Sequence, residues 1–272
     1  MFLPADKVDK CFAILDKFIA IKSKPSRREV DRLLGLLSWC AQVVYGGRAF
    51  MHRMRSARYR DDLGHARGAA DHVYINREFK ADCQWWRDNL VWLNGEVPLT
   101  EPCATCIACI DATGLGGIGV YVDGAFASLA PDSVRSQAAP GEVGHDHPCT
   151  ETSTEWELFA FLVLLRWFGA ALHGIVVRVY NDNGNAVRAV QHFNVSGLHS
   201  EYQARILREI LTLCVRFSVR LQARWLAGTD NTLADALSRQ RWQVVGKVLS
   251  SHVWSRCGRA SPYAGQLCQQ RM

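Results

Sequence analysis

The spacing of apolar residues changes about one third of the way along the chain. In the first part, apolar positions recur every three or four residues, which predicts three helices, over 5–23, 26–45 and 76–94. Ser26 and Glu29 form the signature of a capping box, and Asn76 can cap the third helix. Segment 97–102 then breaks the pattern with two prolines and indicates a linker. We therefore expect a small all-α segment at the start of the chain.

After the linker, short β-type runs alternate with helical patterns. Strands are predicted at Ile107–Ala112, Ile118–Val122, Ala125–Leu129, 175–180 and 219–225, and helices at 154–168, 184–193, from 200, and after Gly228. This order predicts a mixed sheet, with an antiparallel meander followed by parallel strands reached through helical crossovers. The strands at 107 and 175 are apolar throughout, as central strands are. The strand at 219 alternates, which indicates an edge with one solvated face.

Two segments show no such pattern. Residues 130–152 are rich in Pro, Ser, Gly and His and indicate a long loop, and residues 240–272 have no firm periodicity. The longest apolar run, Leu158–Leu165, is too short to span a bilayer, and Met1–Asp6 lacks the start of a secretory signal. The ten cysteines are irregularly spaced, which favours reduced thiols. We expect an intracellular protein, cytoplasmic or nuclear, with no membrane partner.

Charge is divided unevenly along the 272 residues. Residues 1–80 carry 16 Lys/Arg against 9 Asp/Glu, residues 81–239 carry 11 against 17, and residues 240–272 carry 5 against none. An acidic centre between basic flanks suits a cation-binding site served by segments that contact a polyanion, although a merely soluble protein can show the same division.

Four acids lie where the predicted sheet would bring them together. Asp111 ends the first strand, Asp182 ends the strand at 175, and the carboxyl ends of neighbouring parallel strands meet at one edge. Glu157 lies in the first turn of an apolar helix, and Asp235 lies on the helix that follows Gly228. Mg²⁺ prefers such oxygen ligands, and two ions about 4 Å apart can promote phosphodiester hydrolysis.

Each acid also has a simpler explanation. Glu157 can complete a capping box with Thr154, and strand-end aspartates such as Asp111 and Asp182 are common in turns. Asp235 can form a weak surface pair with Arg239. The four simple explanations together are less economical than one shared metal site, which is the interpretation we favour.

The segments around these acids resemble ribonuclease H, in the form fused to the reverse transcriptases of retroelements. They are IDATGLGGIGVY with Asp111, EWELFAF with Glu157, YNDNGNAV with Asp182 and NTLADALSR with Asp235. Upstream, residues 33–50 and Trp85–Leu90 resemble the connection region of LTR-type and DIRS-like retrotransposon polymerases. The resemblance implies a ribonuclease H-like α/β fold with a five-stranded sheet in the order 3-2-1-4-5. It divides the chain into a helical connection (1–100), the ribonuclease H-like domain (101–240) and a basic tail (241–272).

The resemblance also implies a function and a set of site residues. The expected activity is endonucleolytic hydrolysis of the RNA strand of RNA–DNA hybrids, with two Mg²⁺ ions or Mn²⁺ in their place and a polymerase domain as a possible partner. The expected catalytic and metal-binding residues are Asp111, Glu157, Asp182 and Asp235. The expected substrate-binding residues are Thr113, Gly114, Asn183, Asn231 and Arg239.

The chain also departs from this family. It has no Tyr-x-Asp-Asp polymerase motif, and Trp225–Gly228 stands where relatives often have His-Ile-Pro-Gly. The link between the helices at 184 and 200 is too short for a basic handle. A catalytically weak or inactive module that binds nucleic acid or a polymerase therefore remains an alternative, as does, with less support, a nuclease or integrase-like protein acting on DNA.

The cysteines offer one further pattern. Cys103, Cys106 and Cys109 have the spacing of zinc ligands, and His145, His147 and Cys149 follow in the long loop. Cys109 falls inside a predicted strand and no second Cys-x-x-Cys follows, so we favour buried free thiols over a zinc site.

Overall fold

The computed structural model describes residues 2–59, 72–95, 97, 100–130, 153–195 and 200–251. The chain divides into two compact units, one formed by Met1–Pro102 with His192–Ala204, the other by Cys103–Gln191 with Arg205–Met272. The calls on residues 131–152 and on the tail beyond 251 lie outside the described residues. None of the described helices is both long enough and apolar enough to cross a membrane.

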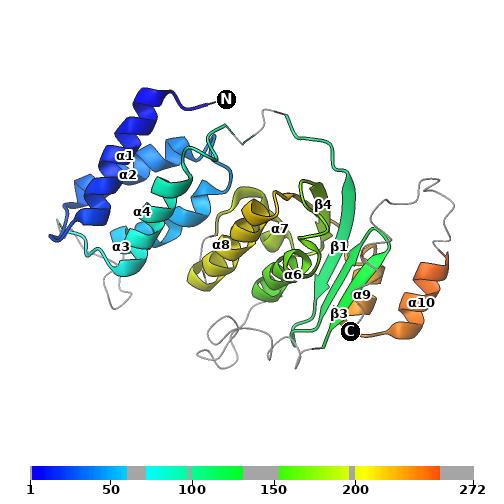
Figure 1. Cartoon of the computed structure of the whole chain (residues 1–272). Helices are drawn as coiled ribbons and strands as arrows, with labels where there is room; N and C mark the ends of the chain where they lie inside the picture. The colour runs from blue at the N-terminus through cyan, green and yellow to red at the C-terminus, as the bar shows by residue number, and fades with distance from the viewer. Residues whose placement is uncertain are drawn as a thin grey trace. The chain divides into compact units, whose positions relative to one another are not determined.

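The first unit is helical (Figure 1). It contains α1 (Ala5–Ala20), α2 (Arg27–Cys40), the 3₁₀ helix η1 (Gly47–Met51), α3 (His52–Tyr59) and α4 (Arg77–Asn89). Both predicted caps are confirmed, because Ser26 and Glu29 form a reciprocal capping box and the Asn76 side chain accepts from the Phe79 amide. Apolar side chains fill the centre, where the rings of Phe18 and Phe79 stack 5.8 Å apart.

Helix α2 ends at Cys40, five residues before the predicted end. Beyond it the backbone turns, Gly46 adopts a left-handed φ of 70°, and Val44 pairs with Asn94 in an isolated bridge. The Gly95 amide also donates to the Val43 carbonyl. These contacts come from a segment fifty residues away, so the local apolar pattern could not predict them.

The second unit is built on a five-stranded sheet. Its strands are β1 (Cys106–Ala112), β2 (Ile118–Val122), β3 (Ala125–Leu129), β4 (Val176–Asn181) and β5 (Arg220–Trp225). The order is β3-β2-β1-β4-β5, with β1, β2 and β3 antiparallel and β4 and β5 parallel to β1. The predicted ribonuclease H-like sheet is therefore confirmed, including the central positions of β1 and β4 and the edge position of β5.

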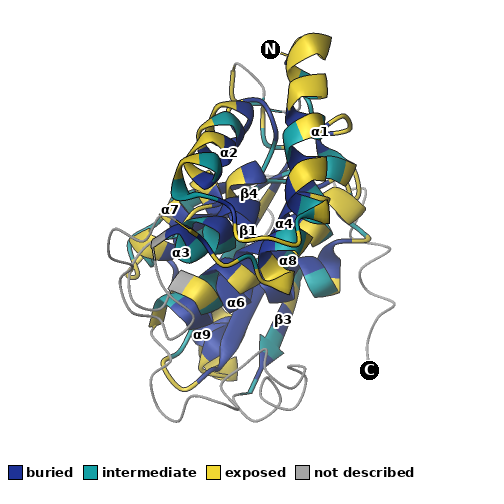
Figure 2. Ribbon diagram, turned by 90° about the vertical axis from the view of Figure 1, so that its left-hand side faces the viewer, coloured by how far each residue is buried: buried dark blue, intermediate teal, exposed yellow. Residues whose placement is uncertain are grey.

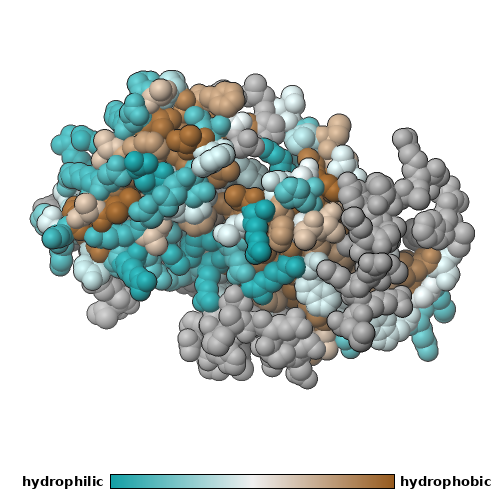
Figure 3. All heavy atoms as spheres, viewed as in Figure 1, coloured by the Kyte–Doolittle hydropathy of each residue, from teal (hydrophilic) through white to brown (hydrophobic). Residues whose placement is uncertain are grey.

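Helices cover the sheet and close its core. They are α6 (Ser153–Phe168), α7 (Gly184–His192), α8 (Ser200–Arg216), α9 (Thr232–Ser238) and α10 (Trp242–Ser251). Helix α6 packs against β1 and β2, whereas α9 packs against all three strands of the meander and also against α10. Buried residues dominate β1, β4 and α6 (Figure 2). The space-filling view shows polar residues over much of the helical unit's visible face, with apolar patches between them (Figure 3).

Two expectations for this unit were wrong. The polar face of β5 is not simply solvated, because Gln222 is buried and accepts a hydrogen bond from Arg178 of β4, while Trp225 at the strand's end is exposed. The segment after residue 240 begins with a helix, α10, whose Val245 packs with Ala236 and Leu237 of α9. This short helix buries only a few apolar residues, so its periodicity is weak in the sequence.

Candidate metal centre

Three of the four expected acids converge at one edge of the sheet. Asp111, Glu157 and Asp182 each present a carboxylate oxygen, and these oxygens all lie within 4.8 Å of one another. Asp111 is near the end of β1, and Asp182 directly follows β4, the parallel neighbour of β1. Because the carboxyl ends of parallel strands meet at one edge, strand pairing itself brings these two aspartates together.

Glu157 reaches the cluster from the first turns of α6. The helix already begins at Ser153, so Thr154 lies inside it and not at a cap position. The Glu157 side chain is buried, and its Oε2 accepts a hydrogen bond of 2.7 Å from Asn181 Nδ2. The capping-box explanation is therefore wrong for this residue, whose carboxylate points into the sheet.

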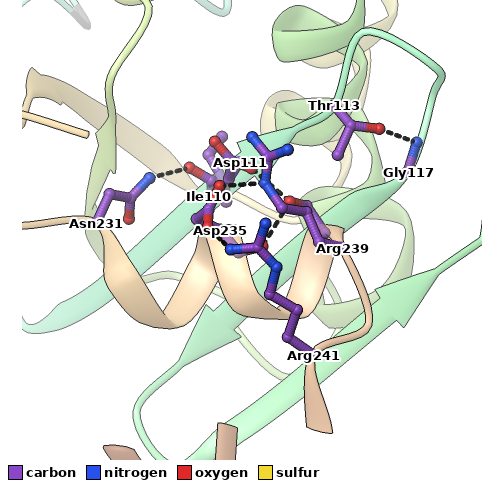
Figure 4. A network of polar contacts seen from close by, with 9 residues as sticks. Ile110, Asp111, Thr113, Gly117, Asn231, Asp235, Arg239 and Arg241 are labelled. Atoms are coloured by element: carbon purple, nitrogen blue, oxygen red, sulfur yellow. Dashed lines mark hydrogen bonds and ion pairs between the residues drawn. The ribbon is translucent and has the colours of Figure 1, made fainter. Parts of the chain in front are cut away.

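Two buried asparagines hold the end of β1 in place. Asn181 Nδ2 and Asn231 Nδ2 both donate to the Ile110 carbonyl, at 3.3 and 2.9 Å. Figure 4 shows the second of these contacts. Asn181 also accepts from the Asn183 amide through its Oδ1, so one side chain connects β1, Glu157 and the turn that carries Asp182. Sequence reasoning missed Asn181, although a polar residue ending an apolar strand directly before Asp182 was an available signal.

Helix α9 supports Asp111 through a residue that sequence reasoning also missed. Ser238 is buried, and its hydroxyl lies in hydrogen-bonding contact with Asp111 Oδ2 and with the Asp235 carbonyl. The helix can approach the sheet closely because β2 has Gly119 opposite Asp111. A β-carbon at Gly119 would overlap the backbone of Ala234 and Ser238.

Asp235 lies beside the cluster but is not part of the three-acid group. Its carboxylate contacts two arginines, with Arg239 Nε at 2.5 Å and Arg241 Nη1 at 3.5 Å (Figure 4). The surface pair with Arg239, the simpler explanation for this acid, is thus present. Asp235 nevertheless remains close enough to influence Asp111, whose pKa it helps to raise.

The cluster is a region of concentrated, buried negative charge. Burial is the main cause that raises the pKa of Asp111 to about 6, and the charges of Asp182 and Asp235 add to it, while Ser238 and Arg239 oppose it. Burial also raises the pKa of Glu157 to about 8, assisted by Asp111 and Asp182 and opposed by the Asn181 hydrogen bond. Such a site resists full ionisation unless a cation enters it.

The expected substrate-binding residues differ in their surroundings. Thr113 Oγ1 accepts from the Gly117 amide within the β1–β2 turn (Figure 4), and Gly114 has open space beside it. Asn183 uses its Oδ1 to accept from the first amides of α7. Asn231 is 2% exposed, which places it under the strand end and away from solvent. Arg239 retains 46% exposure of its side chain.

The described cysteines do not form a metal group. Cys103 is exposed, whereas Cys106 and Cys109 lie three residues apart on β1, so their side chains point to opposite faces of the sheet. His145, His147 and Cys149 lie outside the described residues. Within the described part of the chain, the three acids are the one group of potential metal ligands.

Comparisons with known proteins place this geometry beside ribonucleases H. No protein-family profile and no curated protein sequence matches the chain. Among solved structures, ribonuclease H1 of the halophilic archaeon Halobacterium salinarum matches at 14% identity and a TM-score of 0.35, over 51% of this chain and 97% of the other. A foamy viral protease-reverse transcriptase in complex with double-stranded DNA matches at 14% identity and a TM-score of 0.28, over 79% of this chain. The chain spans 41% of that protein's length.

A further structure of the foamy viral protease-reverse transcriptase, in complex with an RNA/DNA hybrid, has the same identity and TM-score, and the chain spans 26% of its length. The strand order and directions of the sheet themselves define the ribonuclease H-like fold of the second unit.

Proposed function

We propose that this chain is a divalent-metal-dependent endonuclease that hydrolyses the RNA strand of RNA–DNA hybrids. The observation that supports this function is the convergence of Asp111, Glu157 and Asp182 at the carboxyl edge of a ribonuclease H-like sheet. We further propose that the chain is part of, or derived from, a retroelement reverse transcriptase and acts inside the cell. The sequence resemblance upstream of the sheet supports that origin.

The residues present fit a hard divalent cation. The three acids offer only carboxylate oxygens, which Mg²⁺ and Mn²⁺ accept, and the raised pKa values of Asp111 and Glu157 express a charge imbalance that a cation would offset. Asp111, Glu157 and Asp182 would hold one or two ions, with Asp235 as a further ligand once it leaves its arginines. When bound, such ions activate water and stabilise the leaving oxygen of a phosphodiester.

The chain's own residues orient the site. Asn181 fixes the carboxylate of Glu157, and Ser238 fixes that of Asp111, so neither acid depends on an ion for its position. Such supporting hydrogen bonds hold ligands in the geometry that a metal needs. Arg239 is partly exposed beside the cluster and is placed to contact a phosphate of the substrate. Selection of RNA would require contact with the 2′-hydroxyl.

Cleavage of a labelled hybrid tests this function. The full chain should cut a hybrid whose RNA strand carries the label in Mg²⁺ or Mn²⁺, and should leave it intact in a chelator. Asp111→Asn and Asp182→Asn should each reduce the rate by at least about 100-fold, because a direct ligand matters at least as much as its supporting residues. The exposed Asp230→Asn is the matched control and should keep its activity. Equal rates in all four proteins would contradict the proposal.

One observation favours a second candidate function, a binding module without catalysis. Asp235 is paired with Arg239 and Arg241, so the fourth acid is neutralised beside the cluster. A module of this kind would bind the hybrid or a polymerase domain with similar affinity in the presence and absence of Mg²⁺. Hybrid binding without cleavage in either Mg²⁺ or Mn²⁺ would favour it over the nuclease.

A further inference from the structure

Trp225 presents a large apolar surface directly beside the acid cluster. It is the last residue of β5 and is 60% exposed, although an indole is among the most hydrophobic side chains. Its backbone pairs with Asn181, the residue that supports Glu157. An exposed tryptophan in this place needs an explanation that fold stability does not provide.

The Trp225 ring is anchored at one edge. Its Nε1 donates a hydrogen bond of 2.9 Å to the backbone carbonyl of Asp182, one of the three clustered acids. The neighbouring ring atom Cδ1 lies 3.9 Å from the position that a β-carbon at Gly184 would take. The pyrrole edge therefore faces the turn after β4, and the hydrogen bond fixes the orientation of the ring while much of its surface stays in solvent.

The loop that begins at Trp225 also encloses the Asp182 carboxylate. A β-carbon at Gly228 would lie 3.0 Å from Asp182 Oδ2, and the Leu226 amide donates to the Asn181 carbonyl. One short loop thus contacts both the carboxylate of Asp182, through Gly228, and its carbonyl, through Trp225. The ring and the acid keep a fixed relation to each other.

We propose that Trp225 is a positioning residue that stacks on a nucleotide next to the phosphodiester held at the acid cluster. This inference rests on the proposed function, because it assumes that the acids receive a nucleic-acid backbone. A base or ribose adjacent to that backbone meets the exposed ring, and every base has a face that can stack on an indole whatever the sequence. The indole N–H is already used by Asp182, so the contact is made by the ring and selects no particular base.

Nucleic acid is a better occupant than a protein surface for this ring. The tryptophan stands at the end of a strand whose neighbour carries Asp182, so any ligand on the ring also faces the acid cluster. A protein partner would have to place its own surface over three clustered carboxylates. A polyanion with a bridging cation satisfies both the ring and the acids.

Binding measurements on substituted full-length chains test this role. Asp111→Asn serves as the parent, because it should prevent cleavage while Mg²⁺ is present. In that background, Trp225→Ala should raise the Kd for a short RNA–DNA hybrid by about tenfold, within the roughly 5- to 150-fold range expected of one stacked base. Trp225→Phe keeps a stacking face and should stay within about twofold of the parent, the scale of a neutral surface change. Thermal melting checks that each variant is folded.

Trp167→Ala is the matched control. Trp167 is 46% exposed and lies in the last turn of α6, whereas Glu157 lies in its first turns. This variant should bind the hybrid like the parent. If Trp225→Ala does not fold, Trp225→Leu takes its place, and the inference then requires weaker binding for Leu than for Phe.

Cleavage kinetics separate this inference from the nuclease proposal. In a chain with all its acids, Trp225→Ala should raise KM about tenfold and leave kcat within about twofold, because stacking positions the substrate and takes no part in bond cleavage. An unchanged Kd and KM in a chain that cleaves hybrids would overturn only the role of Trp225. Binding that depends on Trp225 without any cleavage would overturn only the nuclease. A parent that binds no hybrid would overturn both.

Discussion

At the scale of single residues, the site depends on carboxylates that are buried before any cation neutralises them. Glu157 is 4% exposed and hydrogen-bonded to Asn181, and Asp111 is equally buried against Ser238. Both carboxyl groups have a raised pKa, to about 8 and about 6 respectively. A group whose pKa is higher in the folded chain than in the unfolded chain costs stability once the pH exceeds its unfolded value.

The first prediction concerns pH and stability without metal. The free energy of unfolding should fall as the pH rises from about 4 to about 8, because Asp111 and Glu157 lose protons that the folded state retains. Glu157→Gln removes the larger part of this cost and should be more stable than the parent by a few kcal/mol at pH 8, on the order of 1.4 kcal/mol per pKa unit. The two proteins should be equally stable near pH 4. Urea unfolding in a chelator measures both values.

Added Mg²⁺ provides the control for this prediction. It should stabilise the parent at pH 8 and leave Glu157→Gln almost unchanged, since the substituted site lacks one of its three charges. A Glu157→Gln chain that is less stable than the parent at pH 8 without metal would show that Glu157 supports the fold and carries no electrostatic cost.

At the scale of elements, the close packing of α9 on the meander determines whether Ser238 reaches Asp111. Gly119 of β2 lies under the helix, and no side chain fits there. Gly119→Ala should therefore displace α9, lower the free energy of unfolding by about 1–3 kcal/mol and weaken metal binding. Chemical unfolding and metal titration measure the two effects.

Gly246→Ala in α10 is the matched control. No atom lies within 4 Å of the position of its β-carbon, and the residue is inside a helix. This change should stabilise the chain by about 0.5–1 kcal/mol through helix propensity. If both alanine variants have the same stability, the contact between α9 and β2 is looser than described.

The elements also show which features a sequence can and cannot predict. The bounds of β2 and β3 match their predictions to the residue, because short apolar runs between turn residues are local signals. The early end of α2 depends on a bridge to Asn94, and the burial of Gln222 depends on Arg178 of the neighbouring strand. Neither contact has a local signature.

The site divides in the same way. Asp111, Glu157 and Asp182 could be found because strand ends and a helix start are visible in the sequence. The pairing of Asp235 with Arg241 could not be found, since it depends on the turn between α9 and α10. Asn181 and Ser238 were missed because their importance lies in what they hold.

At the scale of the whole molecule, an acidic middle segment lies between two basic ones. The chain has a net charge of +6, yet residues 81–239, which contain the acid cluster, carry 17 acidic against 11 basic side chains. A polyanion attracted to the basic segments would be repelled from the cluster unless a cation occupied it. Metal binding by the three acids is therefore the step on which every other part of the proposed function depends.

Titration of the full chain with Mn²⁺, followed by electron paramagnetic resonance of the free ion, tests this step most directly. The unsubstituted chain should bind Mn²⁺, and Asp111→Asn, Glu157→Gln and Asp182→Asn should each weaken the binding by at least about tenfold. Glu201→Gln, which removes an exposed acid of α8, should leave it unchanged. Equal Mn²⁺ affinity in all five proteins would contradict the assignment of the three acids as a metal centre.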